Sequence, residues 1–398
     1  MSKILKFGFV LVSMLVATGV SRGFAQELET PAQHALLMDF DTGAILFEKD
    51  AELPMPPASM SKLMTLTLLF EELKDGRVSL DDKFPVSEHA WRTGGAGTDG
   101  STMFAELGSS IRVEDLIQGI IVQSGNDACI VVAEALAGSE DAFAQQMTKR
   151  AKALGLNNSH FENSTGLPDP EQYMSAHDLA TLARHIIKDL PEYYHYFGET
   201  EFTWNGIKQH NRNPLLYLGI GADGLKTGHT EASGYGMVGS AIRNGQRLIV
   251  VTNGLTSDKQ RAEENRRLLE IGFREFKSYD LLAAGAKVDD AEVWGGDAAR
   301  VPLVVKDPVK VMLLRSSRPG LKVTVRYNGP IPAPITKGQE IGTLNVSAPG
   351  AVAINVPVYA GAAVDRVGPL GQIGNAVVHL LQGRATAPEK AGAQAAAQ

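Results

Sequence analysis

The sequence is poor in the residues that build disulfide and metal sites. Its 398 residues include a single cysteine, Cys129, which excludes an intrachain disulfide framework and a multi-cysteine metal site. The nine histidines are scattered, and none begins the His-Glu-x-x-His spacing of a zinc protease. We therefore expect neither a metal nor another cofactor, so the chemistry has to come from the protein's own side chains.

Runs of basic charge are also missing. Lysine and arginine together number 38 against 45 aspartates and glutamates, which gives a net charge of −7. No basic tract and no interleaving of basic with aromatic residues occurs, so nucleic acid is not an expected partner. A hydrophobic share of 44% in a chain of this length is enough for two domains, each with its own core.

Residues 1–25 have the form of a secretory signal peptide. Lys3 and Lys6 supply a positive start, Phe7–Val20 is the apolar stretch, and small residues lead up to Ala25. We predict cleavage after Ala25 and a mature protein that works outside the cytoplasm. An uncleaved membrane anchor is the alternative, but polar and small residues interrupt the apolar stretch and make it a weak, short span.

The stretch around which the chain is organised joins a short polar motif to an uncharged run. Residues 63–70 carry no charge on any face, which is typical of a helix inside a domain. Ser59 is the predicted N-cap of this helix, and Asp75-Gly76 is its predicted end. Because Ser59 and Lys62 are three residues apart, their side chains share one helix face.

That placement is suited to a nucleophile. It brings a hydroxyl and an amine together at the positive end of a buried helix. Partial desolvation lowers the pKa of such a lysine, and a neutral amine can accept the proton of the serine. By itself, Ser-x-x-Lys should occur by chance on the order of once in a chain of this size, so the motif needs support from the rest of the sequence.

Residues 26–278 read as an α+β domain. A hairpin is expected at 34–48, and Asn244-Gly245 predicts a tight turn between two further strands near the end of the domain. Helical patterns lie between them, and Ser124-Gly125-Asn126 falls at a break between two apolar helices. Strands from both ends of this segment therefore form one antiparallel sheet with helices inserted between them. Cys129 is interpreted as a small core residue.

The C-terminal third has a different character. Short valine-rich runs separated by Pro, Gly and Asn predict a small all-β domain over residues 291–366, in which we find no chemistry. Residues 368–384 predict an amphipathic helix, for which reversible docking on a membrane surface and packing on the β domain are equal alternatives. The Ala/Gln-rich residues 385–398 are expected to be a disordered tail.

Three motifs stand in one order along the chain: Ser59-x-x-Lys62, Ser124-Gly125-Asn126 and Lys226-Thr227-Gly228. A trio of this kind marks class A β-lactamases and penicillin-binding proteins, with Ser-Asp-Asn as its middle motif. The sequence resembles the serine D-alanyl-D-alanine carboxypeptidases, which are low-molecular-weight penicillin-binding proteins. The glycine at position 125, where that motif has Asp, favours the carboxypeptidases among these proteins.

The likeness extends beyond the trio. The further stretches that resemble the family are 57–59, 124–129, 166–169, 211–213 and 226–230. The resemblance implies a β-lactamase/transpeptidase-like catalytic domain followed by a small all-β domain. It also implies a periplasmic enzyme, peripheral on the inner membrane if the C-terminal helix docks there, whose partners are the peptidoglycan stem peptide and β-lactam antibiotics.

The resemblance also assigns catalytic roles. Ser59 would attack the carbonyl between the last two D-alanines of a stem pentapeptide and form an acyl-enzyme. Lys62 would take the proton of Ser59. Ser124 would relay a proton to the leaving amine, with Asn126 orienting Ser124 or the substrate. Alternatively, Ser124 could cap a helix and Asn126 could satisfy loop backbone.

Substrate-binding roles follow in the same way. Lys226 and Thr227 would hold the terminal carboxylate, and Arg212 would add charge there unless it forms a surface salt bridge instead. Gly228 would let the substrate backbone lie against its strand. The N–H groups of Ser59 and His229 would form the oxyanion hole.

Three other functions compete with a carboxypeptidase. A class A β-lactamase needs a glutamate for deacylation, and no Glu-x-x-Leu-Asn box occurs between Ser124 and Lys226. A transpeptidase would pass the acyl group to an amine, but the long N-terminal extension usual in those enzymes is missing. An inactive envelope-binding scaffold would not require the complete set of nucleophile, base and carboxylate anchor.

Overall fold

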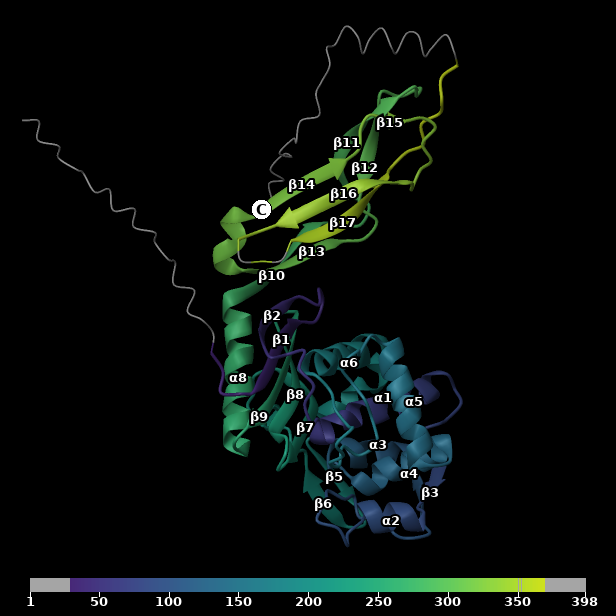
Figure 1. Cartoon of the computed structure of the whole chain (residues 1–398), viewed down its shortest axis with the longest axis vertical. Coiled ribbons are helices and arrows are strands. Elements are labelled where there is room, and N and C mark those ends of the chain that lie inside the picture. The colour runs from purple at the N-terminus through teal and green to yellow at the C-terminus, as the bar shows by residue number, and fades with distance from the viewer. Residues whose placement is uncertain (1–28, 350, 352, 369–398) are drawn as a thin grey trace, which may run out of the picture.

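The computed structural model describes residues 29–349, 351 and 353–368, which form two units joined through helix α8 (Figure 1). The expected signal peptide, the amphipathic helix after Gly368 and the tail lie outside the described residues. Within the described ranges, no helix has both the length and the apolar character needed to cross a bilayer.

The first unit is built on a five-stranded antiparallel sheet in the order β2-β1-β9-β8-β7. Its strands are β1 (His34–Asp39), β2 (Ile45–Lys49), β7 (Ala222–Thr230), β8 (Gly234–Arg243) and β9 (Gln246–Leu255). The hairpins expected at 34–48 and around Asn244-Gly245 are present. At the second turn Asn244 and Gly245 have φ angles of 51° and 79°, as a tight hairpin requires.

Both faces of this sheet are covered. Helix α8 (Asp258–Glu275) packs on one face, and α6 (Ala176–Asp189) lies on the other with the remaining helices beyond it (Figure 1). Successive residues of β1 therefore enter different cores: Leu36 packs with the helical cluster, and Leu37 packs with Leu268 of α8. Alternation along the strand thus explains a sheet that is apolar on both sides.

The helical side of the unit holds the predicted buried helix. The other helices and short strands of this unit are α1 (Lys62–Lys74), α2 (Glu88–Gly94), α3 (Val113–Ile121), α4 (Asn126–Ala137), α5 (Glu140–Ala153), α7 (Pro191–Tyr194), the 3₁₀ turns η1 (Ala58–Ser61), η2 (His195–Gly198) and η3 (Pro214–Tyr217), and the strand pairs β3 (Lys83–Pro85) with β4 (Ser110–Arg112) and β5 (Glu201–Trp204) with β6 (Ile207–His210). Helix α1 is buried along most of its length and ends at Asp75, as expected. Ser59, however, is not its N-cap: it lies inside η1, and Ser61 precedes the first α-helical residue without a side-chain cap bond.

The second unit is all β, as the sequence predicts. Strands β10 (Phe276–Leu282) and β13 (Val309–Leu314) form a pair, and a six-stranded sheet has the order β14-β16-β17-β12-β11-β15. Its strands are β11 (Lys287–Trp294), β12 (Arg300–Val304), β14 (Lys322–Tyr327), β15 (Ile331–Pro332), β16 (Glu340–Ser347) and β17 (Ile354–Ala360), with the 3₁₀ turn η4 (Arg315–Gly320) between β13 and β14. The β structure begins at Phe276, before the expected start at 291. The strand pattern of β10 and of the first half of β11 could not be recognised in the sequence, because charged residues interrupt it.

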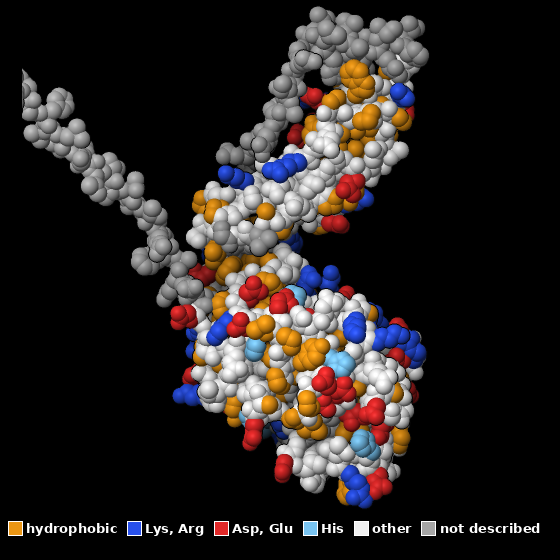
Figure 2. Space-filling view, viewed as in Figure 1, with side chains coloured by type: hydrophobic (Ala, Val, Ile, Leu, Met, Phe, Trp, Pro, Cys, Tyr) orange, Lys and Arg blue, Asp and Glu red, His pale blue; other side chains and the backbone are white. Residues whose placement is uncertain are grey.

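The surface narrows between the two units, and hydrophobic side chains lie on both sides of this junction (Figure 2). A cleft of about 860 Å³ runs there between the β1–β2 hairpin and the β domain, lined by Ile45, Phe276 and Leu313 among others. The chain itself crosses without a linker, because β10 starts at the residue after the last residue of α8.

Candidate active site

The residues that the sequence singles out converge on one cleft of the first unit. Of the predicted site residues, those that line this cleft of about 800 Å³ are Ser59, Ser124, Asn126, Arg212, Thr227, Gly228 and His229. Lys62 and Lys226 lie beneath its floor, each bonded to one of the serines. Three elements meet here: the η1–α1 turn, the turn before α4, and strand β7.

Lys62 is the centre of a hydrogen-bonded group. It is 0% exposed, and its Nζ lies 2.9 Å from Ser59 Oγ and 2.8 Å from Asn126 Oδ1. The third neighbour of Nζ is the carbonyl oxygen of Thr165. Burial is the main cause that lowers the pKa of Lys62 to about 8, from 10.5.

This geometry suits a neutral amine. An uncharged lysine has two N–H groups and one lone pair, whereas the ammonium ion has only donors. The two N–H groups can donate to Asn126 Oδ1 and to the Thr165 carbonyl, which leaves the lone pair for the Ser59 hydroxyl proton. The arrangement can therefore remove a proton from Ser59 without any further base.

The turn that carries Ser59 packs closely against Gly166. Ala58 has a φ of 47°, a left-handed conformation that is unfavourable for a residue with a side chain. Gly166, with φ 81°, lies directly against it, and a Cβ there would be 2.0 Å from the Ala58 carbonyl oxygen. Only glycine fits at position 166, so the backbone there packs directly against the turn that carries Ser59.

Ser124 occupies a second strained turn. Its φ is 59°, its side chain is buried, and its hydroxyl accepts a hydrogen bond of 3.0 Å from Lys226 Nζ. The alternative that Ser124 caps the following helix does not hold, because Gly125 occupies the N-cap position of α4. The side chain of Asn126 accepts from Lys62 rather than satisfying loop backbone.

Lys226 lies in β7 behind the cleft and is 2% exposed. Its Nζ also lies 3.2 Å from the Thr227 carbonyl oxygen. Burial is the largest cause that lowers the pKa of Lys226 well below its usual value, and the charges of Lys62 and Arg212 act in the same direction. A substrate carboxylate would oppose this shift and favour the charged amine.

Gly228 is needed for packing as well as for access. A Cβ at this position would lie 3.0 Å from the Pro57 carbonyl oxygen, 3.1 Å from Met60 Cγ and 3.2 Å from Ala58 Cβ. Strand β7 therefore approaches the η1 turn closely, which brings the backbone of His229 to the same edge of the cleft as Ser59.

Arg212 lines the opposite part of the cleft. Its Nη1 donates to Ser101 Oγ, and within the described ranges it forms no ion pair with a carboxylate, so the alternative of a surface salt bridge does not hold. Burial lowers the pKa of Arg212. The imidazole of His229 stacks on Tyr235 with ring centroids 3.9 Å apart, and it makes no contact with Ser59 that would give it a catalytic role.

Sequence reasoning missed three contributors. Thr165 acts through its carbonyl oxygen, which leaves no side-chain signal. Arg261 comes from α8, a helix rich in charged residues in which no motif marks this arginine, yet its side chain is 5% exposed and lines the cleft. Asp127 stood next to a recognised motif, and its contacts with a loop more than 20 residues earlier could not be foreseen.

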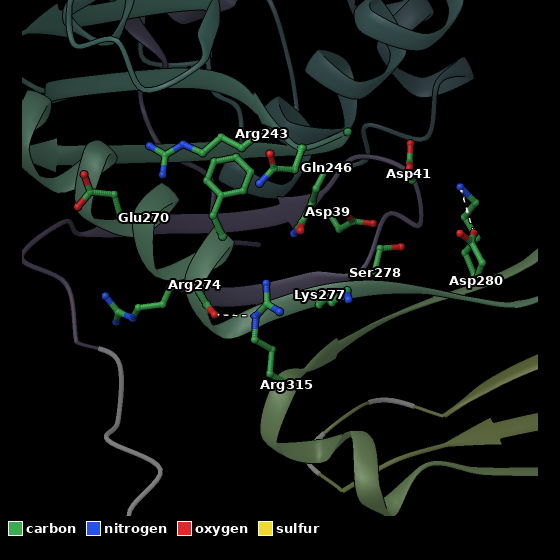
Figure 3. Close-up of a pocket in the computed structure, with 14 residues that line it drawn as sticks. Asp39, Asp41, Arg243, Gln246, Glu270, Arg274, Lys277, Ser278, Asp280 and Arg315 are labelled. Carbon is green, nitrogen blue, oxygen red and sulfur yellow. Dashed lines mark hydrogen bonds and ion pairs between the residues drawn. The ribbon is translucent and has the colours of Figure 1, made fainter. Parts of the chain in front are cut away.

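A second pocket, of about 680 Å³, lies at the domain junction and has different chemistry (Figure 3). Its lining mixes both charge signs, and Arg315 of the β domain donates through Nε to the Arg274 carbonyl oxygen at 2.9 Å. Asp280 and Lys310 form an ion pair at its rim. None of the predicted site residues reaches it. In the part of the chain that the structure describes, no group of three or more metal-ligating side chains occurs either.

Comparison with known proteins agrees with this geometry. Residues 22–256 match the D-alanyl-D-alanine carboxypeptidase family, and residues 276–366 match the C-terminal domain of penicillin-binding protein 5. The chain is 38% identical over 322 residues to the D-alanyl-D-alanine carboxypeptidase DacA of Escherichia coli (strain K12), covering 80% of each chain. It is 37% identical over 353 residues to DacD of the same strain, covering 86% of this chain and 91% of DacD.

Solved structures show the same likeness. Penicillin-binding protein 5 from Haemophilus influenzae superposes with a TM-score of 0.79 at 36% identity, over 85% of this chain and 99% of that one. Penicillin-binding protein D2 from Listeria monocytogenes in its ampicillin-bound form superposes with a TM-score of 0.54 at 29% identity, over 62% of this chain and 98% of that one. The predicted fold class, an α+β catalytic domain followed by a small all-β domain, is confirmed.

Proposed function

The chain belongs to the D-alanyl-D-alanine carboxypeptidase family of serine-type hydrolases, and we propose that it uses Ser59 to remove the terminal D-alanine from peptidoglycan stem pentapeptides. The observation that carries the proposal is the 2.9 Å contact between Lys62 Nζ and Ser59 Oγ in a cleft that also contains the Lys226–Ser124 pair. These contacts support the assignment of a nucleophile, a base and a cationic anchor for a carboxylate to one cleft.

Acylation starts from neutral Lys62. Its lone pair takes the proton as Ser59 Oγ bonds to the carbonyl carbon of the penultimate D-alanine. The negative charge that develops on the carbonyl oxygen is stabilised by the backbone N–H groups of Ser59 and His229, and one such donor is typically worth about 10²–10³ in rate. Their positions on η1 and β7 follow from the close packing at Gly228.

Collapse of the tetrahedral intermediate expels the terminal D-alanine. Its nitrogen has to gain a proton, and Ser124 is a hydroxyl in the cleft that is bonded to an amine, Lys226. Ser124 donates its proton to the leaving nitrogen and recovers one from Lys226, so no free amide anion forms. Lys62 then releases the proton of Ser59 to solvent, and Lys226 regains one from solvent, so both amines return to their starting states. Neutral Lys62 takes a proton from the water that attacks the acyl carbon, and it passes that proton to Ser59 Oγ as the C–O bond to the enzyme breaks and the shortened peptide leaves.

The cleft selects a free carboxyl end by its charge. Arg212 and Arg261 line it, and the amine of Lys226 lies behind Ser124, where a bound carboxylate would favour its charged form. The Thr227 side chain lines the cleft, and its hydroxyl would donate to a carboxylate oxygen. Charge-assisted hydrogen bonds of this kind are about twice as strong as neutral ones, which explains why a peptide with a blocked C-terminus would be a poor substrate.

β-Lactams would react at the same serine. The covalent step is identical up to the acyl-enzyme, because Ser59 opens the lactam ring instead of expelling D-alanine. The structural likeness to an ampicillin-bound penicillin-binding protein supports this proposal. Action in the periplasm, and reversible contact of the C-terminal segment with the inner membrane, remain part of the proposal.

The test compares two hydroxyl deletions in one helical segment. Ser59→Ala should abolish both D-alanine release from a pentapeptide and labelling by a fluorescent penicillin. Thr67→Val, which removes a buried hydroxyl bonded only to the Leu63 carbonyl oxygen, should keep both. Labelling of the Ser59→Ala protein would remove Ser59 from its role. Measuring cross-linked dimer in the same pentapeptide reaction separates hydrolysis from transpeptidation.

A further inference from the structure

We propose that Asp127 is a positioning residue of this active site: its carboxylate holds loop 101–105 against the Ser124–Asn126 turn and thereby fixes two sides of the cleft. The inference deepens the proposed function and rests on it, because the residues that Asp127 positions are those assigned to proton relay and carboxylate binding.

Asp127 has a buried carboxylate that accepts three hydrogen bonds from one loop and a fourth from its own helix. It is 0% exposed, and no Lys or Arg in the described ranges lies within ion-pair distance of it. Its Oδ1 accepts hydrogen bonds from the N–H of Met103 at 2.9 Å and of Ala128 at 3.0 Å. Its Oδ2 accepts from Thr102 Oγ1 at 2.7 Å and from the N–H of Ala105 at 2.9 Å.

Such a site is built for a carboxylate. A buried charge without a cationic partner is tolerated only when hydrogen bonds replace its hydration, and three backbone donors and one hydroxyl do so here. The second position of α4 adds the favourable dipole of a helix N-terminus. The same network imposes a conformation on the loop, since the N–H groups of Met103 and Ala105 must both point inward.

The loop held in this way contacts the substrate-binding part of the cleft. The Ser101 carbonyl oxygen accepts from the Asn126 N–H at 2.8 Å, and the Ser101 hydroxyl accepts from Arg212 Nη1. Asn126 in turn accepts from Lys62. A shift of the loop would therefore move a carboxylate-binding arginine and a partner of the catalytic base together.

Gly125 shows how tightly the carboxylate is enclosed. Its φ of −55° is open to any residue, so backbone conformation does not require glycine there. A Cβ at this position would instead lie 2.8 Å from Asp127 Oδ1, 3.1 Å from the Met103 nitrogen and 3.3 Å from Met103 Cβ. Glycine is required because the carboxylate occupies the adjacent space.

This contact accounts for the departure from the Ser-Asp-Asn motif. In that motif the carboxylate belongs to the residue after the serine. Here the residue after Ser124 is a glycine, and the carboxylate comes from Asp127, two residues later. The site has no room for a side chain at 125 together with the carboxylate of 127, so we infer that Gly125 and Asp127 form one structural unit.

The experiment is Asp127→Asn, with Asp178→Asn as the matched control. Asp178 is also a buried carboxylate in the first turn of a helix, and it accepts from the Asn158 N–H at 2.8 Å and from Ser159 Oγ at 2.7 Å, away from the cleft. An asparagine at 127 keeps one acceptor and turns an N–H₂ group toward the backbone donors. The acylation rate with a fluorescent penicillin is measured per active site, after titration of the sites that label at completion.

We expect the per-site acylation rate of Asp127→Asn to fall about 10- to 100-fold, as for a displaced catalytic group, and KM for a pentapeptide to rise through Arg212. Asp178→Asn should lower Tm while keeping the wild-type rate per site. A per-site rate for Asp127→Asn within twofold of wild type, at whatever Tm, overturns the inference. Failure of the proposed function would appear differently, as labelling that survives Ser59→Ala.

Two further variants cover the case in which Asp127→Asn does not fold. Thr102→Val removes one of the four donors and should lower the per-site rate in the same direction by a smaller factor. Gly125→Ala keeps the carboxylate but places a methyl group against Asp127 Oδ1 and the Met103 nitrogen, so it should reduce the per-site rate strongly in the wild-type background. A wild-type per-site rate for Gly125→Ala or for Thr102→Val would contradict the proposed unit.

Discussion

The lowered pKa of Lys62 has a direct kinetic consequence, because the amine acts as a base only when neutral. At a pKa of about 8, roughly a tenth of the molecules carry neutral Lys62 at pH 7, against about one in 3,000 at the unperturbed 10.5. The second-order rate of acylation by a penicillin should therefore rise about fivefold between pH 7 and 8, by a further factor of about two above that, and level off near pH 9.

The assay follows fluorescent penicillin labelling in the first seconds of reaction at limiting penicillin, from pH 6 to 9.5. Active sites are titrated at each pH so that partial unfolding does not imitate a change in rate. Lys62→Arg provides the control, since a guanidinium keeps its proton throughout this range and should give less than about 1% of the wild-type rate.

An acylation rate that is flat or falls between pH 7 and 9 would refute the reasoning. It would mean that a group other than Lys62 takes the proton of Ser59, because burial of the amine makes a rising limb unavoidable for the proposed mechanism.

Three other predictions concern the same cleft. Between pH 8 and 10.5 the Lys62 amine is protonated in the unfolded chain but neutral in the folded one, so raising the pH favours the folded state. The free energy of unfolding of wild type, measured by urea denaturation relative to Lys62→Met, should increase by up to about 3 kcal/mol over this range. Gly166→Ala should lower Tm and slow acylation at least about tenfold, because the added methyl group would meet the Ala58 carbonyl oxygen; wild-type values for both would show that the turn adapts. Thr227→Val should raise KM for a pentapeptide about tenfold or more while leaving Tm within a few degrees, since it removes one charge-assisted hydrogen bond; an unchanged KM would exclude Thr227 from carboxylate binding.

The features that could be predicted from sequence are those set by local spacing. Ser59 and Lys62 share a helical face whatever the rest of the fold does, and Asn244-Gly245 fixes a hairpin within two residues. The predicted cap at Ser59 was wrong because the chain enters α1 through a 3₁₀ turn, which packing against Gly166 imposes.

The remainder depends on contacts between distant segments. The Thr165 carbonyl oxygen reaches Lys62 across 103 positions, and a backbone group has no sequence signature. Asp127 looks like a charged residue at the start of a helix until loop 101–105 is placed around it. Strand β10 and the first half of β11 were not expected because they combine charged side chains with no fully buried residue, which leaves a weak apolar pattern.

The direct passage from α8 into β10 fixes the distance between the cleft and the far end of the β domain. No linker residues separate Glu275 from Phe276, and Arg315 is bonded to the last turn of α8. The cleft therefore has a fixed orientation relative to the far end of the β domain, where the described chain finishes (Figure 1). The separation of these two points is then set by folded structure, and not by the variable end-to-end distance of a flexible linker. A flexible insertion after Glu275 would spread the distance between the cleft and the far end of the β domain over a range.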